Sequence, residues 1–162
     1  MPLQNMLLVR AALSFLALPA IVAGVMPALI VQGGVPDQRF ALIGFVLLGI
    51  GGFLLLWCVR DFFTAGKGTL APWDPPRHLV VVGLYRFVRN PMYLAVLTIV
   101  AGWSALYLSG TLLAYLSILA VGFHLRVILH EEPWLRRQFG PAWQTYAAAT
   151  SRWLPHWNRK AG

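Results

Sequence analysis

The stretch "NPMYLAVLTIVAGWSALYLSGTLLAYLSILAVGFHL", residues 90–125, contains no Asp, Glu, Lys or Arg. A helix crosses the hydrocarbon core of a bilayer with about 20 apolar residues, so this run is too long for one crossing. Near its centre lies Ser109-Gly110, a dipeptide typical of turns. The run therefore predicts a hairpin of two membrane-spanning helices, at about 92–108 and 111–129.

Two further uncharged runs, at 11–31 and 40–59, are each long enough for one span. Only 11% of the chain is charged, whereas soluble proteins average about 25%. Open backbone cannot be satisfied in lipid, and the runs lack strict alternation, so the spanning elements must be helices. The sequence predicts an all-α, polytopic membrane protein. We expect one membrane domain over 1–162 with about four transmembrane helices, the first two at about 7–31 and 40–59, and short cytoplasmic C-terminal helices.

The basic residues are distributed unevenly along this predicted topology. With four spans, both termini lie on the same side as the 60–90 loop, and only Arg39 of the 13 Lys and Arg falls on the other side. The positive-inside rule then places both termini in the cytoplasm, at the inner or plasma membrane if the source is bacterial. The net charge of +8 indicates attraction to anionic lipid. Nucleic-acid binding is not expected, because the charges follow the membrane edges without a recognition helix.

Glycine and cysteine usage adds two expectations. Gly44, Gly51 and Gly52 share one face of the predicted second span, which favours close approach of another helix; room for a ligand against bare backbone is the alternative. Cys58 is the only cysteine and is expected to be a small buried residue. Because the four histidines are also scattered, no metal site is expected.

The polar segment "GLYRFVRNPMY", residues 83–93, precedes the hairpin directly. Asn90 and Pro91 are good helix-starting residues, since Asn caps and Pro suits the first helical position. Arg86 and Arg89 could simply extend toward lipid phosphates. They could also hold a charged ligand.

The pair Glu131-Glu132 lies at the cytoplasmic end of the last predicted span. Carboxylates at a bilayer edge are costly and mark a candidate functional site, although salt bridges to Arg126, Arg136 or the first arginine group would also explain them. After them, Pro133 suits a helix start, and Gly140-Pro141 ends that helix and begins another.

The hairpin brings both charged groups to one side of the membrane. An arginine and a helix N-terminus bind a carboxylate, a glutamate binds an ammonium group, and Tyr85 and Tyr93 can pack on a flat ring or a cation. The combination favours a zwitterionic ligand.

"GLYRFVRNPMYL" followed by "HEEPWLRRQFGPAWQTYAAATSRWLP" resembles the isoprenylcysteine carboxyl methyltransferase family and the related phospholipid N-methyltransferases. The resemblance covers residues 83–155. It implies an integral-membrane enzyme that uses S-adenosyl-L-methionine without a Rossmann domain. Asn90 stands where the family usually has histidine; because asparagine cannot carry a proton, an acid–base role at this position is in doubt while a cofactor contact is not.

The resemblance also implies residue roles. The implied cofactor pocket is lined by Tyr85, Arg89, Asn90, Pro91, Tyr93, Glu131 and Glu132, and covered by Phe139, Trp143 and Tyr146. The implied methyl acceptor is lipophilic and enters from the bilayer.

The class of acceptor separates the remaining alternatives. A carboxylate of the prenylcysteine type is favoured by resemblance; it is already ionised and needs only Arg86 or Arg126 to orient it. An ethanolamine phospholipid is the alternative, and its ammonium group would require a base such as Glu131 or Glu132. A non-enzymatic membrane scaffold or subunit is a further alternative, in which the charged clusters are only anchors.

Overall fold

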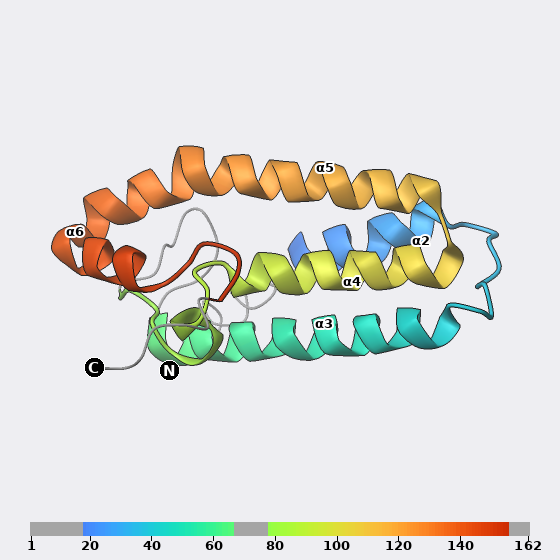
Figure 1. The fold of residues 1–162 in the computed structure, drawn as a ribbon, viewed down its shortest axis with the longest axis horizontal. Helices are drawn as coiled ribbons and strands as arrows, with labels where there is room; N and C mark the ends of the chain where they lie inside the picture. Colours follow the sequence, from blue (N-terminus) through green and yellow to red (C-terminus); the bar gives the residue numbers. More distant parts are fainter. Residues whose placement is uncertain (1–17, 67–77, 156–162) are drawn as a thin grey trace, which may run out of the picture.

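A computed structural model describes residues 18–66 and 78–155, and within these ranges the chain is helical without a β-strand. The segment Leu18–Ile30 and the helices α3, α4 and α5 lie side by side along the longest axis, and α6 packs at one end (Figure 1). In chain order the elements are the π-helical turn η1 (Ile21–Val25), α2 (Met26–Ile30), α3 (Ala41–Asp61), the π-helical turn η2 (Phe62–Gly66), the 3₁₀ turn η3 (Gly83–Arg86), α4 (Pro91–Tyr107), α5 (Gly110–Arg126), the π-helical turn η4 (Val127–Glu131) and α6 (Glu132–Ala149). The all-α prediction is confirmed.

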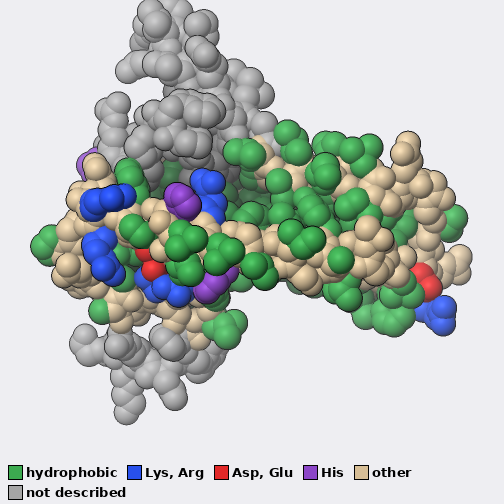
Figure 2. All heavy atoms as spheres, turned by 90° about the horizontal axis from the view of Figure 1, so that it is seen from above, with side chains coloured by type: hydrophobic (Ala, Val, Ile, Leu, Met, Phe, Trp, Pro, Cys, Tyr) green, Lys and Arg blue, Asp and Glu red, His purple; other side chains and the backbone are tan. Residues whose placement is uncertain are grey.

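Two helices are long and apolar enough to cross a membrane: Ala41–Asp61 and the continuous helical segment Gly110–Ala149. Leu18–Ile30 and Pro91–Tyr107 are apolar but shorter. On the face drawn in Figure 2, a belt of apolar side chains covers the middle of the molecule, and the charged groups gather at the two ends. This pattern suits a membrane protein. The four-span topology stays a prediction, and the beginning of the expected first span lies outside the described residues.

Small residues let α3 and α4 approach closely. A Cβ on Gly44 would lie 2.8 Å from Cβ of Leu106, and one on Gly51 would lie 2.6 Å from Cγ1 of Ile99. The expected helix contact is therefore confirmed for these two glycines and wrong for Gly52, which has nothing within 4 Å. Gly52 instead lines a hollow of about 340 Å³ between the first helical segment, α3 and α4.

The predicted hairpin is formed by α4 and α5. Leu108 adopts a left-handed conformation, and Ser109 caps α5 by accepting a hydrogen bond from the Leu112 N–H at 3.2 Å. Pro91 occupies the first turn of α4 as predicted, and Asn90 is the N-cap residue. The prediction that the Asn90 side chain caps the helix was wrong, because its Nδ2 donates to the Arg152 carbonyl at 3.1 Å instead.

The last turn of α5 widens into the π-helical turn η4, in which the Glu132 N–H donates to the Val127 carbonyl. Residues five apart point in very different directions in an α-helix but come closer in direction in a π turn. The Arg126 and Glu131 side chains meet on one side of this turn. Pro133 lies in the first turn of α6, as expected. Gly140, at φ 49° and ψ −122°, breaks α6 into two helical pieces at the predicted Gly140-Pro141 site.

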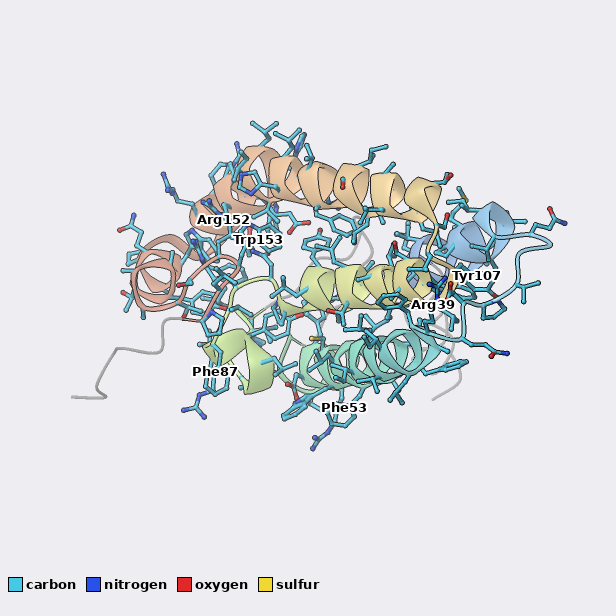
Figure 3. The ribbon with its side chains drawn as sticks, turned by 45° about the vertical axis from the view of Figure 1, so that its right-hand side comes forward. Arg39, Phe53, Phe87, Tyr107, Arg152 and Trp153 are labelled. Atoms are coloured by element: carbon cyan, nitrogen blue, oxygen red, sulfur yellow. The ribbon has the colours of Figure 1, made fainter. Side chains whose placement is uncertain are left out.

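The described arginines divide between the ends of the molecule as the charge pattern predicted. Arg39 lies at the end that holds the α2–α3 and α4–α5 connections, where it pairs with Asp37 at 3.3 Å. By the bounds of the elements, the other described arginines lie in or beside the opposite ends of α3, α4 and α5, or in α6 and the segment after it. Figure 3 shows one of them, Arg152, at the end of the molecule away from Arg39. We call the Arg39 end of the molecule the outer end and the opposite one the inner end.

We expect reporter fusions at residue 36 and at the C-terminus to report opposite sides of the membrane, with the C-terminus cytoplasmic. The physical reason is the retention of basic loops on the cytoplasmic side. An alkaline phosphatase and green fluorescent protein fusion pair at each position measures it. Identical sidedness at both positions would contradict the four-span topology.

Gly83 begins η3 with φ +52° in a tight position. A Cβ there would lie 1.8 Å from Oδ2 of Asp61 and 3.1 Å from Nε1 of Trp57. Asp61 is the last residue of α3 and only 8% exposed, and its Oδ2 has no hydrogen-bonding partner within 18–66 and 78–155. Gly83 therefore allows the segment before α4 to lie directly on the end of α3.

We predict that Gly83→Ala lowers the free energy of unfolding by about 2 kcal/mol or more, because a side chain at positive φ is strained and also collides with Asp61. Thermal unfolding in detergent measures the effect. Gly122→Ala is the matched control, since Gly122 lies in α5 with open space around it; alanine there should leave the melting temperature unchanged or raise it. Equal melting temperatures for wild type and Gly83→Ala would refute the close approach.

Candidate functional site at the inner end

A short segment after α6, residues 150–155, returns across the start of α4; we call it the C-terminal strap. The Arg89 N–H donates to the Ser151 carbonyl at 2.8 Å, and Val88 and Ser151 form a single parallel β-bridge. Together with the bond from Asn90 to the Arg152 carbonyl, these contacts fix the residues just before α4 against the strap.

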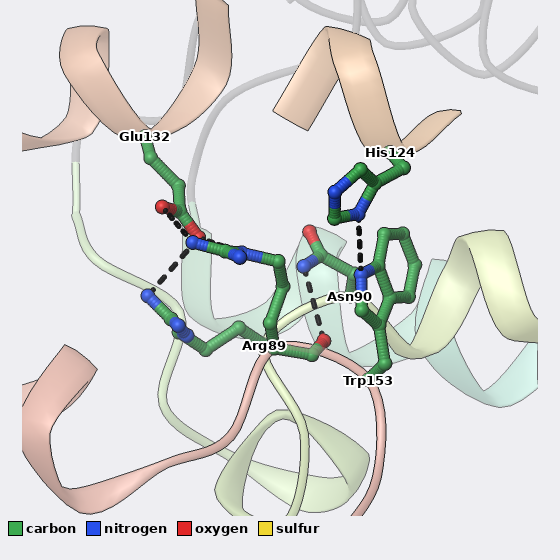
Figure 4. Close-up of polar contacts among 6 residues, drawn as sticks. Arg89, Asn90, His124, Glu132 and Trp153 are labelled. Carbon is green, nitrogen blue, oxygen red and sulfur yellow. Dashed lines mark hydrogen bonds and ion pairs between the residues drawn. The ribbon is translucent and has the colours of Figure 1, made fainter. Parts of the chain in front are cut away.

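Glu132 forms ion pairs with two guanidinium groups, that of Arg89 before α4 and that of Arg152 in the strap (Figure 4). Its Oε1 is 3.1 Å from Nη1 of Arg89, while Arg152 donates from Nε to Oε1 at 2.7 Å and from Nη2 to Oε2 at 2.8 Å. The Glu132 side chain is 15% exposed. Burial alone would raise its pKa, but the Arg152 hydrogen bonds and the charges of Arg89, Arg152 and Arg136 outweigh burial and lower the pKa below its usual value.

Glu131 is held by a second set of partners on α4 and α5. Its Oε1 accepts hydrogen bonds from the Tyr93 hydroxyl and from Nε of Arg126, the latter at 2.8 Å. Arg126 Nε also lies 3.2 Å from the Tyr93 hydroxyl oxygen. The two adjacent glutamates therefore point to different partners and connect α4, α5, α6 and the strap.

Aromatic rings surround the Tyr93 side chain. Tyr93 stacks on Phe123 of α5 with ring centroids 4.5 Å apart, and Trp153 of the strap lies 6.5 Å away. Trp153 in turn donates from Nε1 to Nδ1 of His124 at 3.1 Å (Figure 4).

A third group of side chains joins α6 to η3. The Arg89 guanidinium lies 5.6 Å from the centroid of the Trp143 ring, a cation–π contact. Trp143 meets Tyr146 edge-on, and the Tyr146 hydroxyl donates to the Tyr85 carbonyl at 2.7 Å. Burial raises the pKa of Tyr85, with smaller contributions from Cys58, Tyr146, Asp61 and Glu131, so the phenol is neutral.

Most of the residues that the sequence nominated are connected by these contacts, with Pro91 buried at the start of α4: Tyr85, Arg89, Asn90, Tyr93, Arg126, Glu131, Glu132, Trp143 and Tyr146. Two nominated residues lie apart. Arg86 is exposed on η3, and the ring contact of Phe139 within the described residues is with Trp134 of the same helix.

Sequence reasoning missed the strap residues Ser151, Arg152 and Trp153. The available signal was a basic and an aromatic residue following α6 on the same side of the membrane as two adjacent glutamates. The sequence also did not single out Asp61, whose buried carboxylate lies next to Gly83. A single carboxylate at the end of an apolar run resembles an ordinary residue of the membrane interface.

The sequence profile of the phospholipid methyltransferase family matches residues 40–142, more than half of the chain. The chain belongs to this family. The match begins just before α3 and ends within α6, so it includes Arg89, Arg126 and both glutamates. No curated protein and no solved structure matches the chain significantly.

Membership of this family identifies the chain as a methyltransferase-type membrane protein, consistent with its long apolar helices. Trp143, Tyr146 and the strap lie beyond the matched residues. The contacts of the strap with Arg89, Asn90 and Glu132 are therefore visible only in the tertiary structure.

We predict that the stability contributed by Glu132 is fully present above about pH 4.5 and is lost as the pH falls through its lowered folded-state pKa. The difference in melting temperature between wild type and Glu132→Gln should therefore be largest near neutral pH and should shrink below pH 4.5. Thermal unfolding of both proteins across this range measures it. A difference that does not change with pH would contradict the ionised pairing with Arg89 and Arg152.

Proposed function

We propose that this protein is an S-adenosyl-L-methionine-dependent methyltransferase that acts on a lipophilic acceptor in the membrane. The observation that carries the proposal is the cluster of Arg89, Arg152 and Glu132 beside Arg126, Tyr93 and Glu131, located at the inner end of a chain of the phospholipid methyltransferase family.

The cluster has unused donors that suit a cofactor with a carboxylate. Nε of Arg89 and Oγ of Ser151 are buried and have no hydrogen-bonding partner among residues 18–66 and 78–155. Three guanidiniums face two carboxylates, which leaves one positive charge. Arg89 and Ser151 would hold the carboxylate of the cofactor.

When bound, the cofactor would supply an electrophilic methyl group on a sulfonium. The protein residues then have two tasks, which are to position the acceptor in line with this group and to exclude water. The strap and the Trp143–Tyr146 pair cover the Arg89 side of the cluster. Tyr93, stacked on Phe123 and hydrogen-bonded to Glu131, forms the wall nearest the membrane-spanning part of α5.

The surface of the molecule supports a lipophilic acceptor. The hollow at Gly52 is lined almost entirely by apolar atoms of the first helical segment, α3 and α4. Large apolar side chains such as Phe45, Phe53 and Ile118 are more than half exposed, as expected of surfaces in lipid. An acceptor chain can therefore remain in the membrane while its polar end approaches the inner end.

The family match favours a phospholipid as the acceptor, methylated at its headgroup nitrogen. A carboxylate of the prenylcysteine type is the second candidate, and the state of the glutamates favours it. Both are held by arginines, so neither is well placed to take a proton from an amine. A carboxylate acceptor needs no base and could be oriented by Arg126, whose side chain is 59% exposed.

The deciding experiment is labelled methyl transfer by the purified protein to phosphatidylethanolamine and to a farnesylcysteine analogue, each between about pH 6 and 8. Transfer to the amine should rise with pH as the nitrogen loses its proton. Transfer to the carboxylate should be nearly flat, because its pKa is about 3.5.

Cofactor binding, followed by calorimetry, is the control for this assay. Arg89→Gln should weaken binding about tenfold or more through the loss of a charged hydrogen-bonding partner, whereas the exposed Arg137→Gln should not. If the wild type binds no S-adenosyl-L-methionine and methylates neither acceptor, the cluster is structural and the protein is a non-enzymatic scaffold or subunit.

A further inference from the structure

A second polar feature lies on the other side of Arg126, outside the cofactor cluster. Leu125, Arg126, Leu129 and His130 line an open hollow of about 390 Å³ at the inner end of α5 and in η4. The space-filling view shows basic and histidine side chains gathered at this end of the molecule, next to the apolar belt (Figure 2). Cationic and apolar surfaces therefore meet within one helical turn.

Arg126 connects this hollow to the cluster. Its Nε is occupied by Glu131 and Tyr93, while the side chain is 59% exposed and lines the hollow. A guanidinium has further N–H donors in a planar fork, so one edge can bind Glu131 while the other faces outward. No described residue makes a hydrogen bond or ion pair to the terminal nitrogens of Arg126.

His130 supplies the second polar group of the hollow, four residues after Arg126. Arg126 and His130 both line the hollow, so their side chains reach the same open space at the end of α5 and in η4. The side chain is exposed, and no hydrogen bond to a described residue engages it. Two separated donors suit an anion that has several oxygens.

The apolar residues of the hollow point to a lipid. Leu125 is 46% exposed and Leu129 is 62% exposed, and both line the hollow together with Arg126 and His130. A soluble anion gains nothing from exposed leucines. A glycerophospholipid at the cytoplasmic edge presents a phosphate and the beginning of its acyl chains to such a surface, and basic residues there attract it.

We propose that this hollow binds the phosphate of the glycerophospholipid acceptor, with Arg126 and His130 as its ligands and with Leu125 and Leu129 against the lipid chains. The inference rests on the proposed function and deepens it. The headgroup nitrogen of an ethanolamine phospholipid is separated from the phosphate oxygen by two carbon atoms. A phosphate on the outer edge of Arg126 therefore places this nitrogen close to Tyr93 and Glu131, which lie against the inner edge.

The ammonium group is attracted there by the carboxylate and by the ring face of Tyr93. Arg126 acts in this arrangement as a positioning residue, because its guanidinium bridges the acceptor phosphate and Glu131. The planar Arg126 guanidinium lies between the phosphate and the Glu131 carboxylate. It therefore sets the distance of the headgroup from the cluster.

Direct binding tests the proposal independently of activity. In neutral detergent, calorimetry with dioctanoyl phosphatidic acid should show binding by the wild type, about tenfold weaker binding by His130→Gln and weaker binding still by Arg126→Gln, the expected loss for hydrogen bonds to a charged group. Arg137→Gln, an exposed arginine of α6 outside the hollow, is the matched control and should bind as the wild type does. Equal affinities in all four proteins would overturn the assignment.

Two further probes identify the ligand. Inorganic phosphate should compete only at much higher concentration than the lipid; equal competition would show a simple anion site and overturn the lipid assignment.

The second probe is oleylamine, used as a methyl acceptor that has an amine and an alkyl chain but no phosphate. His130→Gln should raise the KM for phosphatidylethanolamine about tenfold and should leave the KM for oleylamine unchanged. Equal effects on both would overturn the phosphate role. If lipid binding follows the prediction while the wild type transfers no methyl group, the proposed function fails and the binding site stands.

Discussion

The contact of Glu132 with Arg89 and Arg152 is the interaction on which the inner end depends. One carboxylate joins the segment before α4, the start of α6 and the strap, which are far apart in the sequence. The Glu132 and Arg89 side chains are 15% and 13% exposed, so breaking the pair would leave buried charges without a partner. This penalty favours keeping the three charged groups together, next to the aromatic side chains of Trp143, Tyr146 and Trp153.

Backbone geometry prepares this interaction. The π-helical turn η4 rotates Glu131 toward Arg126 and Tyr93 while Glu132 points to the strap, so two consecutive residues serve two sets of partners. Such turns are less favourable than a regular α-helix and often occur at functional sites. Gly83 and Gly140 contribute in a similar way, since each adopts a positive φ where the chain must bend at the inner end.

Local sequence signals predicted part of this fold correctly. The α4–α5 hairpin, the start of α4 at Pro91 and the break at Gly140 follow from local signals and are present. The side chain of Asn90 departs from its local preference: it donates to the Arg152 carbonyl instead of capping the helix. Gly52 differs from its prediction for another reason: it was expected to contact a helix, but it faces a hollow. Which glycine of α3 faces a helix and which faces a hollow depends on how the first helical segment, α3 and α4 are placed.

Composition and residue order were enough to predict the helical class, the uneven placement of the arginines and the importance of Glu131 and Glu132, because apolar runs and charges are visible in the chain before it folds. Tertiary structure alone decided that the two glutamates have different arginine partners, that Ser151, Arg152 and Trp153 belong to the site and that Arg126 has one engaged and one open edge. These are distances between residues remote in the sequence. They follow from how the helices pack and how the strap returns, and no local pattern encodes them.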